Sequence, residues 1–470
     1  MNKIDATAGT LSPMNISGVE DILLEYIGSG KINQAKELFQ NRDDEVLEAI
    51  KEFETSEHVI MKRMDKERKG NDPYRTEKLP IAWQRYINDV SVFFMFAKPV
   101  IWREVSPKDE TEEAFKAYED FLKKTKFFTG IREAKRRAGA ETESAKVYHI
   151  YKGKDGLPKV KPIVISKSLG YTLRPLFDQY GDMVSFAYGY FLKEGNKTVE
   201  YFDIMMPDYI YKCKKEGTGW VVDKINNPIG KIPAIYYRQP KEWDGVQERI
   251  ERDEYLDSTQ ADTNNYFADP IAKISSSVIN SVPNAEQVGK LIQLQSKDDI
   301  FEYVSPPTAT EMRDSEKKTI RDTILLNSFT PDFSYEQMKG IETLSGEAMK
   351  RALIVGYIKR DIRMEIYDEL LDREKNIILA IMKNVTHIRL ASKINKLEIE
   401  HELSEPFDSD TEERWTAIGR AYTDKIMSLE TAVDHLGVAN PMEEVERIRS
   451  AQQMNDELLM FPNANPNNEE

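Results

Sequence analysis

A helical pattern of unusual length occupies much of the C-terminal third of the sequence. From residue 345 to about residue 394 apolar side chains return at helical spacing, and Ile358, Ile362, Ile366 and Leu370 are four positions apart. Helices in globular proteins average about 11 to 12 residues. We therefore expect this helix to be the spine of an extended unit; a long core helix in a large bundle is the alternative.

The hydrophobic period changes from helical to alternating between about residues 145 and 238. Short Val, Ile, Tyr and Phe runs are separated there by connections too short for helical crossovers, so the strands should pair antiparallel. Pro233 predicts that the last strand begins there or lies at a sheet edge, because proline cannot donate to a ladder. The expected strands span residues 147–151, 161–165, 184–192, 199–205, 209–212, 220–223 and 234–237.

Helical patterns flank this strand-rich module on both sides. They lie within residues 19–64, from residue 83 to before Pro99, and at residues 110–126, 245–267 and 311–328. A chain of 470 residues with this pattern should form about two to four packed units of the α+β class. In the 110–126 helix the buried stripe should consist of Phe115, Tyr118, Phe121 and Leu122.

The charge is acidic and concentrated at one end. The net charge is −15, and residues 401–470 hold 16 acidic and 5 basic side chains. This balance opposes a protein that clamps nucleic acid through a basic face. The acidic end is either a solvated helical surface or a segment that repels partners or DNA. The basic run at residues 123–137, with Phe127 and Phe128 inside it, is better interpreted as a solvated helix face than as a nucleic-acid contact.

Cysteine and hydropathy exclude several classes of protein. Cys213 is the single cysteine, so neither an internal disulfide nor a multi-thiolate zinc site is expected. The first 18 residues lack a secretory apolar core, and the longest apolar run, residues 92–97, stops at Lys98. We therefore expect a protein that is neither exported by a signal peptide nor membrane-spanning.

Motifs for enzymatic chemistry are incomplete. The segment Gly28-Ser29-Gly30-Lys31 hints at a phosphate loop, but Glu25 and Ile32 stand where the loop needs Gly and Ser or Thr. The five histidines form no HExxH pair, and the acidic stretch at residues 408–413 lacks the Gly and Glu of a calcium loop, so it is interpreted as a helix start. We expect no catalytic residue, cofactor or metal.

Five stretches, taken in order, carry a resemblance to a known family. They are residues 88–100, which end in Ala97-Lys98-Pro99-Val100; residues 230–235; residues 255–268; residues 343–350, which contain Ser345-Gly346; and residues 407–447. In this order the chain resembles the portal proteins of tailed bacteriophages, in the branch found in many phages of Gram-positive hosts. Ala97 departs from the family's usual Gly, which leaves the local turn open.

The resemblance implies a mainly helical α+β portal fold. Its wing would comprise residues 1–244, helical first and strand-rich from about residue 145. Stem helices would span residues 245–268 and 308–329, with a clip at 269–307 between them. A tunnel loop at 330–344, a long wing helix at 345–400 and a helical crown with the acidic tail at 401–470 would follow.

The resemblance also implies where contacts are made. Gly346 would act through its backbone at the entrance of the long helix and Ser345 as its cap. Lys339 is the only basic residue of the expected loop, so its contact with DNA should be weak and independent of register. The expected site residues are Phe333, Tyr335, Glu336, Lys339 and Glu342 in the loop; Ser345, Gly346 and Lys350 at the helix entrance; and Lys290, Gln293, Lys297 and Asp298 in the clip.

The function implied is a ring of about twelve subunits at one capsid vertex, assembled in the host cytoplasm and retained in the virion. Double-stranded DNA would be packaged and ejected through it. The expected partners are the terminase large subunit, a head-completion or adaptor protein, and the major capsid and scaffolding proteins, with no membrane. The alternatives are a non-portal scaffold or connector subunit and, less favoured, a nucleic-acid enzyme of the packaging apparatus.

Overall fold

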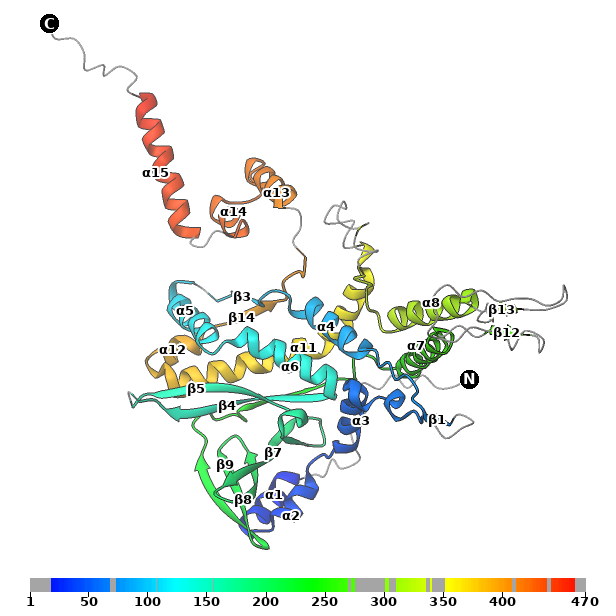
Figure 1. The fold of residues 1–470 in the computed structure, drawn as a ribbon. Helices are drawn as coiled ribbons and strands as arrows, with labels where there is room; N and C mark the ends of the chain where they lie inside the picture. Colours follow the sequence, from blue (N-terminus) through cyan, green and yellow to red (C-terminus); the bar gives the residue numbers. More distant parts are fainter. Residues whose placement is uncertain are drawn as a thin grey trace. The chain divides into compact units, whose positions relative to one another are not determined.

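The computed structural model describes residues 18–67, 73–106, 108–154, 156–268, 272–274, 301–303, 310–334, 339, 351–407, 411–437 and 441–460. The chain divides into two compact units, one of residues 1–332 with 355–404 and one of residues 333–354 with 405–470. Figure 1 shows the elements along the chain.

The N-terminal part of the first unit is helical, as its apolar spacing predicts. Gly30 adopts φ 71° between the first two helices, a left-handed conformation that favours glycine. Two 3₁₀ turns, Thr55–Glu57 and Val59–Lys62, follow the third helix. The α-helices are α1 (Val19–Gly28), α2 (Ile32–Leu38), α3 (Asp43–Phe53), α4 (Trp83–Phe96), α5 (Lys108–Lys124) and α6 (Phe127–Glu141).

The strand-rich module consists of two antiparallel sheets. The three-stranded sheet has the order β11 (Ala234–Arg238), β4 (Glu143–Lys152), β5 (Pro158–Ile165). The five-stranded sheet has the order β10 (Gly219–Asn226), β9 (Tyr209–Glu216), β8 (Lys197–Met205), β7 (Met183–Glu194), β6 (Thr172–Phe177). All seven expected strands are confirmed, and β11 is an edge strand, as Pro233 predicts. One further strand, β6, was not predicted; it is an edge strand that contains Pro175.

Three short strand pairs complete the described sheets. They are β1 (Lys66–Glu67) with β2 (Pro73–Tyr74), β3 (Ile101–Glu104) with β14 (Ile399–Glu402), and β12 (Ala272–Ile274) with β13 (Phe301–Tyr303). All three pairs are antiparallel. The pair β12–β13 lies within the segment expected to be the clip.

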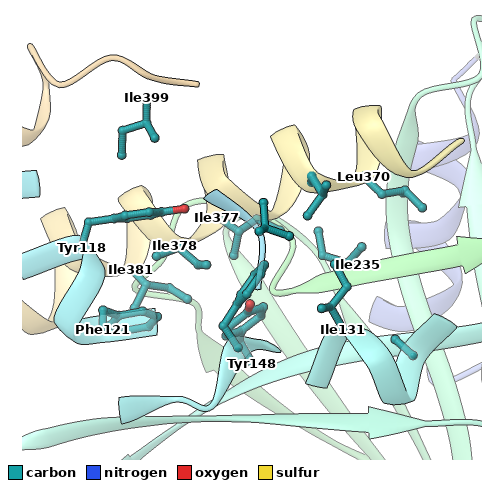
Figure 2. Close-up of a cluster of buried hydrophobic side chains, with 14 of the residues drawn as sticks. Tyr118, Phe121, Ile131, Tyr148, Ile235, Leu370, Ile377, Ile378, Ile381 and Ile399 are labelled. Atoms are coloured by element: carbon teal, nitrogen blue, oxygen red, sulfur yellow. The ribbon is translucent and has the colours of Figure 1, made fainter. Parts of the chain in front are cut away.

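Apolar side chains gather on both faces of the sheets. Helices α1 and α2 cover β8 and β9, where Cys213 is buried and burial raises the pKa of its thiol to about 12. A second cluster fills the space between the two sheets. The largest cluster joins α5, α6 and α11 (Ile354–Ile381) to β4, β5 and β11, and Figure 2 shows part of it. Tyr118 and Phe121 are buried there and Phe115 and Leu122 are partly buried, which confirms the expected stripe.

The long helix ends earlier than the sequence predicts. Helix α11 stops at Ile381, and a π-helical turn (Met382–Thr386), a 3₁₀ turn (Ile388–Leu390) and α12 (Ala391–Ile394) follow. The expectation of one helix to residue 394 is therefore wrong, and its start at residues 345–350 lies outside the described residues. The wider turn allows Met382 and Val385 to enter the core, while Asn384 donates to the Ile229 carbonyl at 2.8 Å.

Helices α7 (Gln247–Ala268) and α8 (Thr310–Asn327) confirm the two helical patterns after the sheets. The second unit contains α13 (Thr411–Thr423), α14 (Leu429–His435) and α15 (Pro441–Met460). The Ser428 hydroxyl accepts from the Thr431 amide and caps α14. Among the described residues, no helix combines the length and apolar character needed to cross a bilayer.

Candidate functional site

Only two of the expected site residues fall within the described part of the chain. Lys339 is exposed and Phe333 is half-buried. Both belong to the second compact unit, whereas α7 and α8 belong to the first. The remaining ten lie outside the described residues: Tyr335, Glu336, Glu342, Ser345, Gly346, Lys350, Lys290, Gln293, Lys297 and Asp298. Their roles stay predictions.

Helices α7 and α8, the expected stem helices, form an antiparallel pair (Figure 1). At one end of the pair Ile250 of α7 packs with Ile320 and Ile324 of α8 around the buried Trp243 ring. Beyond this apolar end the contacts are ionic. Arg321 Nε lies 3.0 Å from Asp253 Oδ2 and its Nη2 lies 3.0 Å from Asp257 Oδ2.

Most of the pair's surface is polar, and α7 carries an excess of carboxylates. By sequence, α7 contains six acidic and two basic side chains, whereas α8 contains four of each. Of the basic residues of α8, Lys317 and Arg321 form ion pairs with Asp257, whereas Lys318 is exposed. The pair therefore has a net charge of −4 by sequence, and part of its positive charge is engaged in ion pairs between the two helices.

Buried polar side chains of α7 hold an extended segment, which we call the strap (residues 76–82). The strap's amides donate to α7 in order: Glu77 to Asp262 Oδ1 at 2.8 Å, Leu79 to Ser258 Oγ at 3.0 Å, and Ile81 to Glu254 Oε1 at 2.9 Å. Four residues of helix rise about 6 Å, and two residues of extended chain span about 6.6 Å. The two repeats nearly match, so every second strap amide meets a helix acceptor.

A buried histidine, His58, also forms a hydrogen bond with one of these acceptors, Glu254. His58 Nδ1 lies 2.6 Å from Glu254 Oε1, and its Nε2 lies 2.8 Å from the Glu52 carbonyl. Burial alone would lower the pKa of His58, but the hydrogen bonds to Glu254 and Glu52 outweigh burial and raise it. In the protonated form both ring nitrogens donate, which matches the two acceptors.

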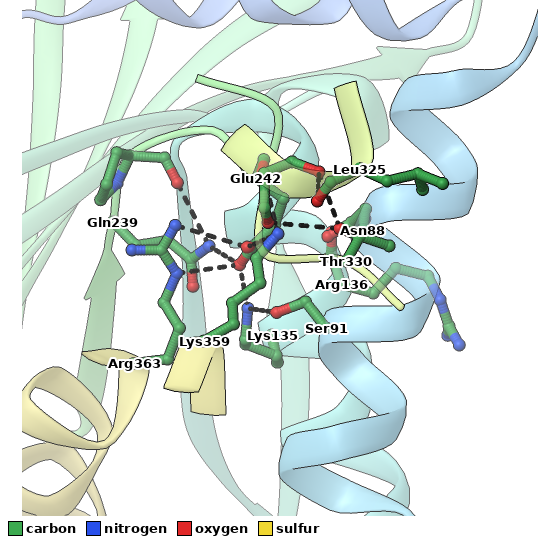
Figure 3. Close-up of polar contacts among 12 residues, drawn as sticks. Asn88, Ser91, Lys135, Arg136, Gln239, Glu242, Leu325, Thr330, Lys359 and Arg363 are labelled. Atoms are coloured by element: carbon green, nitrogen blue, oxygen red, sulfur yellow. Dashed lines mark hydrogen bonds and ion pairs between the residues drawn. The ribbon is translucent and has the colours of Figure 1, made fainter. Parts of the chain in front are cut away.

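A fully buried carboxylate, Glu242, orients the entry into α7. It lies in the segment between β11 and α7 and accepts from three cations (Figure 3). Lys135 of α6 contacts it directly, Lys359 Nζ lies 3.1 Å away and Arg363 Nε also 3.1 Å away. Gln239 Nε2 adds a hydrogen bond at 2.7 Å. The cluster thus ties α6 and α11 to the chain that becomes α7.

The charged groups in this cluster shift one another's pKa values. Burial would raise the pKa of Glu242, but the three cations outweigh it and hold the pKa well below its usual range. Burial lowers the pKa of Lys135 to about 8, with Arg363 and Lys359 adding to the effect and Glu242 opposing it. Lys135 Nζ also donates to Ser91 Oγ of α4 at 3.2 Å. The polar network around this carboxylate therefore connects α4, α6, α11 and the segment before α7.

A second buried carboxylate, Glu374 of α11, faces the three-stranded sheet. It accepts from Lys146 Nζ at 2.6 Å, from the Tyr148 hydroxyl, and from the Tyr237 hydroxyl at 3.0 Å. Helix α11 thereby binds the sheet and the α7 entry through charged groups, in addition to its apolar contacts with the sheet. Removing either carboxylate would leave buried cations without a counter-charge.

These contacts are not predictable from the sequence pattern, and one residue lies in a different environment from the one predicted. Lys135 belongs to the basic run interpreted as a solvated face, and that interpretation is wrong for it because Lys135 is fully buried. Its position between Ile131 and Ala138, both buried on the same stripe of α6, was the available signal. The part of the chain that the structure describes contains no group of three or more His, Cys, Asp and Glu side chains placed to hold a metal ion.

Comparisons with known proteins give the family. A family model described as "Phage portal protein, SPP1 Gp6-like" matches residues 30–458. No curated protein matches. A solved structure described as the neck of an empty GTA particle, computed with C6 symmetry, shares 11% identity and a TM-score of 0.40, over 76% of this chain and 88% of that chain. That likeness is too weak to carry an argument. Because the family model spans nearly the whole sequence, the chain belongs to the SPP1 Gp6-like family of phage portal proteins and serves as a phage portal protein.

Proposed function

We propose that about twelve copies of this chain form a closed ring at one capsid vertex, with an axial channel for double-stranded DNA. The observation that carries the proposal is the α7–α8 pair. It is polar along most of its length, has a net charge of −4, and is fixed to the rest of its unit by the strap and the Glu242 cluster. A helix pair that is polar on most sides suits a solvated channel wall.

The charge of the pair suits a conduit. Each phosphate neutralised by Lys or Arg adds salt-dependent affinity, so a wall rich in free cations would retain DNA. The α7–α8 pair instead uses Arg321 and Lys317 in internal ion pairs. DNA would slide past such a wall with little binding, which packaging and ejection both require.

The remaining regions are assigned by the family resemblance. Residues 245–268 and 308–329 would be the stem, and residues 330–344 the tunnel loop, in which Lys339 touches DNA beside Phe333, Tyr335, Glu336 and Glu342. Residues 1–244 and 345–400 would form the wing, with Ser345, Gly346 and Lys350 at the start of its long helix. Residues 401–470 would form the crown.

The clip at residues 269–307 would meet the partners outside the capsid. Its expected contact residues are Lys290, Gln293, Lys297 and Asp298, first against the terminase large subunit and later against a head-completion or adaptor protein. The major capsid and scaffolding proteins would surround the ring during assembly in the host cytoplasm. The role we propose is structural and requires no catalysis by this chain.

Electron microscopy of the purified protein, with native mass spectrometry to count subunits, tests the ring. We expect a ring with an axial channel and about a dozen copies. A monomer or compact dimer at every concentration, including in the presence of scaffolding protein, would refute it.

Lys339→Glu tests the tunnel loop in a packaging assay. The variant should form rings but package or retain less DNA, because the only basic contact of the loop has become repulsive. Lys51→Glu, the same charge change at an exposed position of α3, is the matched control and should package normally. Equal packaging by both variants would contradict the assignment.

A further inference from the structure

Strand β10 leaves one edge of the five-stranded sheet open. It is the terminal strand of that sheet, and β9 is its only strand partner in the described part of the chain. The register with β9 runs without a bulge over all eight residues. A two-residue turn joins the strands, so Gly219 and every second residue after it are hydrogen-bonded to β9. The backbone N–H and C=O groups of Trp220, Val222 and Lys224 therefore point away from the sheet.

The other edges of the two sheets are protected. Strand β6 contains Pro175 and β5 contains Pro158 and Pro162, and proline has no N–H to offer to a further strand. Strand β11 is buried along almost its whole length. By contrast, β10 contains no proline, and the Lys224 ammonium extends back over the Tyr209 ring of β9, 3.6 Å from the ring centroid. An exposed, regular edge without such protection is a place where another strand can add.

Side chains on one face of the sheet form rows that end at β10. In the middle row, Asp203 of β8, Lys212 of β9 and Asp223 of β10 lie directly opposite one another, so the charges alternate. Asp223 is exposed and forms no ion pair with any residue that the structure describes. The flanking rows end at Val221 and Ile225, which are 50% and 37% exposed. An added strand should therefore carry a basic side chain between two apolar ones, each two residues away.

Strand β3 carries this sequence on its exposed face. Ile101 and Arg103 lie in β3 and Val105 directly follows it; Ile101 is 40% and Val105 is 52% exposed. Arg103 contacts Glu402 of β14 at 2.7 Å, and an exposed ion pair of this kind contributes little stability. Among the strands that the structure describes, only β3 places a basic side chain between two apolar ones in this spacing on an exposed face.

The backbone of β3 has the phase that such pairing requires. The Val105 amide donates to the Glu398 carbonyl at 2.9 Å, so Val105 and every second residue before it are hydrogen-bonded toward β14. The backbone groups of Trp102 and Glu104 therefore point away from β14. Strand β14 is the only strand partner of β3 within the described ranges, so this edge is also unpaired.

An antiparallel pairing of the two edges satisfies backbone and side chains together. With Arg103 opposite Asp223, the outward backbone groups of β3 meet the outward groups of β10 and bond to them reciprocally. The same register extends the alternating charges of the middle row by one strand. It also brings the exposed apolar side chains into cross-strand pairs, which are Ile101 with Ile225 and Val105 with Val221.

We propose that β3 of one copy of this chain adds antiparallel to β10 of a second copy, with Arg103 of one copy opposite Asp223 of the next. The contact joins two different surfaces of the chain, and head-to-tail contacts of this type build rings when the rotation between copies closes. The proposal rests on the ring proposed above and names one contact between its neighbouring subunits. Both strands belong to the same compact unit of the chain.

Disulfide trapping in the full-length protein tests the register. Val105→Cys combined with Val221→Cys should give a ladder of cross-linked copies on oxidation, because opposite Cβ atoms of antiparallel strands lie about 4.5–5.5 Å apart. The native Cys213 is buried and can stay in place. Ile101→Cys combined with Val221→Cys is the matched control: its positions are four residues out of register, about 13 Å apart, and should cross-link little. No cross-link in the first pair, or equal cross-linking in the control, would overturn the proposal.

Charge reversal tests the side-chain row. Asp223→Arg and Arg103→Asp should each weaken self-association about tenfold in analytical ultracentrifugation, because like charges then face each other. The variant with both changes should recover to within about threefold of the wild type. Glu48→Arg, at an exposed position of α3, is the matched control and should associate normally. A double variant as weak as either single one, with the fold confirmed by circular dichroism, would show that the two side chains do not meet.

Electron microscopy of the cross-linked samples separates this contact from the ring itself. Wild-type rings, together with no cross-link between Val105→Cys and Val221→Cys, would refute the strand pairing and leave the ring standing. Cross-linked copies that form only open chains would support the pairing and refute the closed ring. Closed rings that carry the cross-link at every contact are the expected result.

Discussion

Replacing Asp203 by Asn should stabilise the strand-rich module at neutral pH, although it removes a buried hydrogen-bonding carboxylate. Burial raises the pKa of Asp203 from 3.8 to about 6, and the bonds from Tyr188 and Tyr190 and the charge of Lys212 offset only part of that rise. A shift of about 2.2 units corresponds to about 3 kcal/mol of destabilisation when the group is ionised. Asn avoids this cost but leaves an amide N–H₂ without a partner, at roughly 1 kcal/mol, so the net gain is about 2 kcal/mol.

The sign of the pH dependence follows from the same shift. Because the folded-state pKa lies above the unfolded value, the folded wild type binds more protons between pH 3.8 and about 6, and its stability falls as the pH rises through that window. Above about pH 6 the cost is complete. The advantage of Asp203→Asn should therefore be largest at pH 7–8 and should vanish, or reverse slightly, near pH 4.

Hydrogen–deuterium exchange of the β7 and β8 amides measures this difference locally. A gain of about 2 kcal/mol corresponds to roughly a 30-fold smaller opening equilibrium. Asp223→Asn, on the exposed face of β10, is the matched control and should leave protection unchanged. Unchanged protection of the Asp203 variant at pH 7.5, or a gain of equal size at pH 4, would refute the reasoning.

Three further changes test the anchoring of α7. Glu242→Gln should destabilise the first unit by about 3–5 kcal/mol in urea unfolding, because three cations lose their buried counter-charge; an effect below 1 kcal/mol would contradict this. Ser258→Ala should cost about 1–3 kcal/mol, because the Leu79 amide loses its buried acceptor; limited proteolysis should then cut the strap faster, and equal cleavage rates would count against the contact. Since the pKa of His58 is raised, the stability that its protonated form contributes should be complete below about pH 6.5 and should be lost as the pH rises through the raised value. Hydrogen–deuterium exchange of the strap amides should show this loss of stability in the wild type and not in His58→Gln.

The sequence predicts the elements of this fold well because local spacing sets them. The seven expected strands and the helices up to α8 follow from apolar period and turn residues. The misses have local causes as well. Strand β6 was not predicted because it contains Pro175, and proline is tolerated there because β6 lies at the edge of its sheet. The helical spacing continues past Ile381, although the chain there widens into a π-helical turn.

The contacts that fix the candidate site could not be predicted in the same way. Glu242 meets Lys135 and Lys359 across more than one hundred residues of sequence in each direction, and no periodicity specifies such partners. The spacing of Glu254, Ser258 and Asp262 does mark a polar stripe on α7, but only the structure shows that the strap covers it. The loop and clip residues proposed to contact DNA and partners rest on the family resemblance.

The match between strap and helix has a mechanical consequence. The three strap bonds lie in a row parallel to the α7 axis. A force along that axis loads the three bonds in shear and at the same time. Rupture then requires breaking all of them together, whereas a pull perpendicular to the axis would peel them apart one after another. The junction is therefore stiffest along the α7 axis, which is the direction of DNA thrust if α7 lines the channel of the proposed ring.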